Sequence, residues 1–189
     1  MTRASRLVVL CAALTLPGAA AAQRVTAIDP AGSEIRFVSK QMNVPVEGRF
    51  RKFAVQIDFD PSKLASSKAQ VEVDLGSIDT GSDEADAEVK GKGWFNIAAF
   101  PKATFVSSSV KSVGANRYEV TGRLTIKGIS QDLAVPLTIK HDGSSSVFEG
   151  GFNLLRLQFK IGEGPWSDED TVANAVQVRF RFVGVNKKP

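Results

Sequence analysis

Apolar and polar side chains alternate with a period of two along most of this chain, and this pattern predicts antiparallel β-strands with one buried face. The alternation is clear near the C-terminus, where Val176, Val178 and Phe180 share one side of a predicted strand and Gln177 and Arg179 share the other. Short turns between such segments favour an all-β fold, an up-and-down antiparallel barrel. Eight strands are predicted, near residues 34–40, 53–59, 71–75, 103–109, 118–126, 133–139, 147–159 and 176–182.

One stretch, residues 77–109, interrupts the alternation and predicts a short helix near one end of the barrel. Ser82 can cap a helix with an acidic first turn, and Lys90 lies in its last turn, just before Gly91. The helix has few apolar side chains, so we expect it to cover the fold rather than to fill it. The aromatic pair that follows, at 94–95, is expected to dock at the nearby barrel end.

The N-terminus predicts the cellular compartment. Two arginines precede an apolar run of about ten residues, which is followed by a tract of small residues ending at Ala22. This is typical of a secretory signal peptide, residues 1–22, cleaved before Gln23 to leave one barrel domain, 23–189. We therefore expect a periplasmic or secreted protein. The apolar run is too short to span a bilayer, and no later run is long enough to predict a membrane span.

Removal of the signal peptide changes the candidate chemistry. The single cysteine of the chain leaves with it, and the remaining 22 basic and 20 acidic residues give a net charge of about +2. No basic stripe interleaved with aromatic residues is present, so nucleic acid is not an expected partner. With one histidine, His141, and no mature cysteine, the usual zinc and copper sites are excluded. No motif brings a nucleophile and a base together, so we predict a protein that is not an enzyme.

Apolar surface is the remaining candidate for a binding function, because all twelve phenylalanines lie in the predicted mature chain. Both a filled barrel and a hollow one fit the periodicity. A hollow barrel would bind a long apolar ligand, since each buried five-carbon prenyl unit contributes roughly 3–4 kcal/mol. From strand phase, the candidate lining residues are Phe37, Phe53, Val55, Ile57, Val73, Trp94, Phe95, Phe105, Leu124, Ile126, Val135, Leu137, Phe152, Val178 and Phe180.

Several motifs in order resemble the YceI family over about residues 25–183. They include Ser-Ile-Asp-Thr-Gly at 77–81, Trp-Phe-Asn at 94–96 with Phe-Pro-Lys-Ala-Thr-Phe at 100–105, and Gly-Arg-Leu-Thr-Ile-Lys-Gly-Ile-Ser at 122–130. The resemblance implies a lipocalin-like eight-stranded barrel with a helix near its mouth, holding a polyisoprenoid or a quinone with an isoprenoid tail. It also implies a periplasmic location, a homodimer, no covalent cofactor and no catalytic activity.

The chain departs from the family pattern on the predicted helix. Where many members carry Arg-Asp-x-His-Leu, this chain has Ala85, Asp86, Ala87, Glu88 and Val89. A diphosphate head group would meet acidic side chains there, so we expect an uncharged head such as a quinone.

Two hypotheses about function follow. The aromatic motifs near 94 and 166 are similar to those of members that accompany membrane b-type cytochromes, so the first hypothesis is a carrier that serves such a cytochrome or the envelope stress response. The second is a ligand-free interaction module with a filled barrel, which docks a membrane or periplasmic partner through the Trp94 and Trp166 loops.

Overall fold

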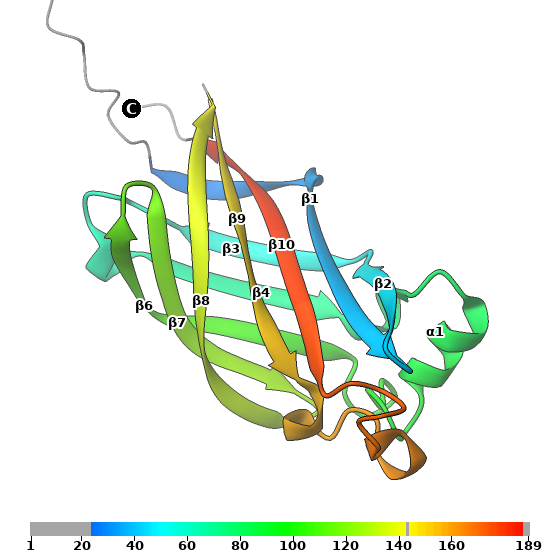
Figure 1. Cartoon of the computed structure of the whole chain (residues 1–189). Coiled ribbons are helices and arrows are strands. Elements are labelled where there is room, and N and C mark those ends of the chain that lie inside the picture. The colour runs from blue at the N-terminus through cyan, green and yellow to red at the C-terminus, as the bar shows by residue number, and fades with distance from the viewer. Residues whose placement is uncertain (1–23, 143, 187–189) are drawn as a thin grey trace, which may run out of the picture.

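The structure, a computed structural model, describes residues 24–142 and 144–186 and consists of one curled antiparallel sheet with a single α-helix at one end (Figure 1). The predicted signal peptide, 1–22, lies outside the described residues. The sheet has ten strands in the order β3-β4-β6-β7-β8-β9-β10-β1-β2-β5. The strands are β1 (Val25–Gln41), β2 (Val44–Phe50), β3 (Phe53–Asp58), β4 (Lys68–Asp74), β5 (Ile78–Asp79), β6 (Lys102–Gly114), β7 (Arg117–Ile126), β8 (Ile129–Asp142), β9 (Ser145–Leu155) and β10 (Ala175–Asn186).

The all-β, barrel-like prediction is confirmed, but the predicted number of eight strands is wrong. The two unpredicted strands are β2, which contains Pro45 and Gly48, and β5, which has only two residues. Proline and glycine are signals of turns, and a two-residue strand is too short to show a period. The sheet curls so far that the edge strand β3 approaches the start of β1, where Val25 and Phe59 exchange two backbone hydrogen bonds of 2.9 and 3.0 Å.

The helix α1 (Asp83–Lys90) matches the predicted one. The Ser82 hydroxyl accepts a hydrogen bond from the Ala85 amide, and Gly91 ends the helix. Asp86 holds the helix to the loop after β5, because its Oδ1 accepts from the Thr80 amide at 2.8 Å and from the Thr80 hydroxyl at 2.7 Å. Figure 1 shows α1 at one end of the sheet, beside the β1–β2 hairpin. Four 3₁₀ turns complete the described elements: η1 (Leu64–Ser66), η2 (Leu75–Ser77), η3 (Arg156–Phe159) and η4 (Gly164–Ser167).

Two separate groups of buried side chains occupy the interior. The far-end cluster lies away from α1 and is densely aromatic: Phe59 meets Tyr118 at 5.2 Å and Phe148 at 5.6 Å, both edge to face. Such pairs add to the free energy of burial. The helix-end cluster comprises Leu75, Ile78, Phe95, Ala103, Leu124, Ile126, Phe159 and Ile161. The other members of the far-end cluster are Val25, Ile35, Ile139 and Phe182.

Candidate ligand-binding cavity

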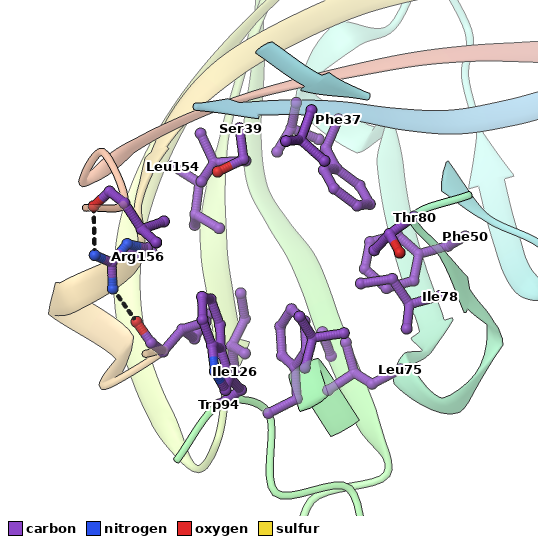
Figure 2. A pocket seen from close by; sticks show the side chains of 18 of the residues that line it. Phe37, Ser39, Phe50, Leu75, Ile78, Thr80, Trp94, Ile126, Leu154 and Arg156 are labelled. Atoms are coloured by element: carbon purple, nitrogen blue, oxygen red, sulfur yellow. Dashed lines mark hydrogen bonds between the residues drawn. The ribbon is translucent and has the colours of Figure 1, made fainter. Parts of the chain in front are cut away.

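The helix-end cluster surrounds a cavity of about 400 Å³ that has an almost wholly apolar lining. This volume falls in the range of typical small-molecule sites. In Figure 2, Phe37, Phe50, Ile78, Leu75, Trp94, Ile126 and Leu154 form a ring around an empty centre. The inside of the barrel is therefore hollow at the helix end and closely filled at the far end, where a void bordered by Phe59, Tyr118 and Phe148 measures about 40 Å³.

Strand phase predicted part of this lining. Eight of the fifteen candidate residues border the cavity, namely Phe37, Val73, Trp94, Phe95, Leu124, Ile126, Phe152 and Val178. That these side chains bind a ligand stays a prediction.

The other candidates lie elsewhere, and their placement in the lining was wrong. Phe53, Val55, Ile57, Leu137 and Phe180 pack against the far-end cluster. Phe105 packs beside the helix-end cluster without reaching the cavity, and Val135 is buried outside it. The period of two tells which face of the sheet a residue occupies but not its height along the barrel. Since only one end is hollow, inward-facing residues at the other end are core.

Sequence reasoning missed several lining residues. Phe50 and Ile78 come from the two unpredicted strands, and Ala103 is too small to stand out as apolar lining. Leu154 had a usable signal, because it follows Phe152 by two positions and therefore shares its face. The remaining lining includes Ser39, Gln41, Val46, Leu75, Thr80, Glu84, Ala85, Glu88, Val89, Arg156, Ile161, Trp166, Val172 and Val176.

Glu88 joins the two tryptophans of the chain at the helix side of the cavity. Its Oε1 accepts a hydrogen bond from the Trp94 indole at 3.1 Å and another from the Trp166 indole at 2.9 Å. The two rings lie 5.6 Å apart at 51°. The Glu88 carboxylate thereby links α1 to η4 across 78 residues. We call this group, Glu88 with Trp94 and Trp166, the indole clamp.

Substitution of Glu88 should disturb the environment of both tryptophans. With Glu88→Ala we expect a shift and broadening of the tryptophan emission, because both indole N–H groups lose their acceptor. Glu88→Gln keeps a carbonyl oxygen and should resemble the parent protein. Since Trp94 and Trp166 are the only tryptophans, steady-state fluorescence reports on this clamp alone. An unchanged spectrum for Glu88→Ala would contradict the clamp.

Arg156 forms part of the cavity wall although it carries a charge. Its side chain is 1% exposed and has no carboxylate within salt-bridge distance among residues 24–142 and 144–186. All five of its N–H groups donate to main-chain carbonyls. The Nε donates to Ala173 at 3.1 Å. The Nη1 donates to Ile161 at 2.8 Å and Gly162 at 3.1 Å, and the Nη2 donates to Trp166 at 2.6 Å and Val172 at 2.5 Å. Figure 2 draws two of these contacts.

Burial lowers the pKa of Arg156 from its ordinary value. The guanidinium nevertheless stays protonated, because carbonyl dipoles on every donor replace the lost water. It also lies 5.8 Å from the centre of the Trp94 ring, within reach of a cation–π contact. Gly162 makes this packing feasible: its φ is +77°, and a Cβ there would lie 2.4 Å from the Nη1 of Arg156. Arg156 therefore fastens the 161–173 loop against the cavity wall and has no donor left for a ligand.

Metal-ligating side chains do not gather in the part of the chain that the structure describes. No cluster of three or more potential metal-ligating side chains occurs in it. His141 lies at the end of β8, where its Nδ1 is 2.9 Å from the Ser146 hydroxyl, and it does not border the cavity. No helix within the described ranges is long and apolar enough to cross a membrane.

Comparison with known sequences identifies relatives in several bacteria. The chain is 31% identical to a UPF0312 protein of Azotobacter vinelandii over 141 residues, which cover 70% of this chain and 73% of that protein. It is 32% identical to a UPF0312 protein of Pseudomonas syringae pv. tomato over 150 residues, 76% of this chain and 75% of the relative.

Solved structures show the same fold. BcnA of Burkholderia cenocepacia superposes with a TM-score of 0.81 at 44% identity, covering 83% of this chain and 99% of that one. A polyisoprenoid binding domain from Saccharophagus degradans superposes with a TM-score of 0.68 at 16% identity, covering 87% and 99%. The model of the YceI-like domain matches residues 27–184. With nearly all of the described barrel inside that match, the chain belongs to the YceI-like family.

Proposed function

We propose that this protein is a periplasmic binding protein or carrier for a polyisoprenoid or an isoprenoid quinone, held in the helix-end cavity. The observation that carries the proposal is the cavity of about 400 Å³ with its apolar wall, in a barrel whose other end is filled. The fold shared with a domain named for polyisoprenoid binding agrees with it. The proposal includes the periplasmic location expected from the signal peptide, a homodimer, and a membrane b-type cytochrome or the envelope stress response as the setting.

An apolar tail would supply most of the binding free energy. Each buried five-carbon unit contributes roughly 3–4 kcal/mol, so a short tail offsets the cost of association without a polar anchor. The wall offers matching apolar surfaces, including Leu124 and Ile126 of β7 and Leu75 of η2.

The polar groups of the cavity favour an uncharged head. All donors of Arg156 are already used by carbonyls, so its guanidinium cannot clamp a phosphate. The other charged side chains that border the cavity are Glu84 and Glu88, which would repel an anion. A quinone needs only hydrogen-bond donors of the kind that Ser39 and Gln41 provide.

Ligand extraction tests the proposal. Protein purified without detergent should release an isoprenoid lipid or quinone into organic solvent, detected by mass spectrometry. In a second step, the emptied protein should bind a short-chain ubiquinone at least about tenfold more tightly than a prenyl diphosphate with the same tail, a difference of about 1.4 kcal/mol. Titration can be followed by quenching of Trp94 and Trp166. Repeated extraction of nothing, together with no quenching by the quinone, would favour the ligand-free interaction module.

A further inference from the structure

The outer face of three neighbouring strands carries a row of arginines. Arg36 of β1 lies directly opposite Arg179 of β10 on one side and directly opposite Arg49 of β2 on the other. Like charges in directly opposed positions destabilise a sheet, and at about 4.8 Å between strands the row extends over about 10 Å. β10 and β1 can be followed side by side in Figure 1.

Two of these arginines, Arg36 and Arg49, form a hydrogen bond to a carboxylate through the Nε only. The Nε of Arg36 donates to the Glu34 carboxylate at 2.8 Å, and the Nε of Arg49 donates to Asp79 at 2.8 Å. Their terminal Nη atoms make no hydrogen bond within residues 24–142 and 144–186. The carboxylates thus orient the guanidinium groups without covering the fork of N–H groups that would face a ligand.

The third arginine, Arg179, is exposed and has no ion pair or hydrogen bond with any residue in those ranges. The Asp79 carboxylate is shared by two arginines, because it accepts a hydrogen bond from Arg51 at 3.0 Å as well as the one from Arg49. These hydrogen bonds hold the pKa of Asp79 below its ordinary value, so it stays ionised and keeps its place.

All three arginines line one hollow of about 410 Å³ at the outer face of the sheet, and Phe37 is the one residue that this hollow shares with the lining of the ligand cavity. Glycine contributes to its shape at two places, Gly48 and Gly81. The other residues that line it are Phe37, Val38, Glu47, Asp79 and Gln177. Its two acids partly offset the three positive charges, which leaves the hollow cationic.

We propose that this hollow, the arginine groove, binds a ligand that carries phosphate groups. Paired Nη–H donors match phosphate oxygens in a bidentate manner, and each phosphate offers three strong acceptor oxygens. The groove presents three such forks in a line, more than a single carboxylate can satisfy. Binding would also relieve the repulsion between the opposed arginines.

Inorganic diphosphate is the first probe. We expect isothermal titration calorimetry on the full mature protein to detect its binding, and Arg179→Gln to weaken it about tenfold or more, since charge-assisted hydrogen bonds are lost. The matched control is Arg123→Gln, which removes the same charge from an exposed β7 position outside the groove. Arg36→Gln should weaken binding similarly while keeping or raising the melting temperature of the free protein. Absence of binding at millimolar diphosphate and to the vesicles described below, or equal weakening by Arg179→Gln and Arg123→Gln, would overturn the proposal.

A second arm separates the sources of phosphate. Co-sedimentation uses vesicles of phosphatidylcholine alone and of equal parts phosphatidylcholine and phosphatidylglycerol. Binding of diphosphate but not of anionic vesicles indicates a soluble ligand, whereas sedimentation with anionic vesicles that Arg179→Gln abolishes indicates a lipid head group. Either result supports the phosphate site. Binding of poly-glutamate with no response to either phosphate probe would overturn it. The groove lies outside the cavity, so these outcomes do not depend on the isoprenoid proposal.

Discussion

Ala103→Phe should reduce the affinity for an apolar tail by more than about a hundredfold while the protein remains folded. Ala103 lies on β6 opposite Val73, is 6% exposed and borders the cavity. A phenyl ring placed there enters empty space of about 400 Å³ and so does not overpack the core. The ring takes the place of about one five-carbon unit, whose burial contributes roughly 3–4 kcal/mol. Ligand content after purification and affinity for a short-chain quinone are the measurements.

Val106→Phe is the matched control for this substitution. Val106 is on the same strand but 49% exposed, on the outer face, so the same ring is added away from the cavity. We expect its ligand content to equal that of the parent protein. If Ala103→Phe retained normal cargo and affinity with a normal circular dichroism spectrum, the helix-end cavity would not be the binding site.

Arg156→Met should lower the free energy of unfolding by at least about 3 kcal/mol. The substitution keeps an unbranched but shorter side chain and leaves five main-chain carbonyls without their donor. A buried acceptor that stays unpaired costs about 1–3 kcal/mol. An apolar replacement cannot compensate, because the partners are backbone groups that stay in place. Urea denaturation followed by circular dichroism measures the change.

The control for Arg156 is Arg123→Met, at an exposed ion pair with Asp132. This change should alter stability by no more than about 0.5 kcal/mol. Arg156→Lys should recover only part of the loss, since an ammonium group has three donors instead of five. A difference of about 1 kcal/mol in the free energy of unfolding is close to the experimental error of such measurements. If Arg156→Met unfolded with a free energy within about 1 kcal/mol of the parent protein, Arg156 would not fasten the 161–173 loop.

The parts of the fold that depend on local chemistry could be predicted from the sequence. Helix α1 was predicted because Ser82 and Gly91 satisfy its ends by themselves. The inward faces of β7 and β10 were predicted because their alternation is unbroken. Strand β2 was not, since Pro45 and Gly48 resemble turn residues even though the whole segment pairs with β1.

The candidate site depended more on contacts between distant segments. The Glu88–Trp166 hydrogen bond joins residues 78 positions apart, and no local pattern marks it. Arg156 has a charge that normally predicts exposure, yet carbonyls from a loop up to 17 residues further along surround it. Phe53 and Phe180 face inward as expected but lie at the filled end. The position of a residue along the barrel axis depends on how the sheet curls. The alternation of apolar and polar residues carries no information about that position.

The division of the interior between a filled far end and an open helix end bears on how such proteins diverge. The aromatic contacts of Phe59 with Tyr118 and Phe148 hold the strands together at a distance from the cavity. Lining residues can therefore change during evolution at a smaller cost to folding, and with them the shape of the cavity. Neighbours with 44% and 16% identity share the fold of this sheet. Scaffold and pocket are in this sense separate evolutionary modules on one continuous sheet.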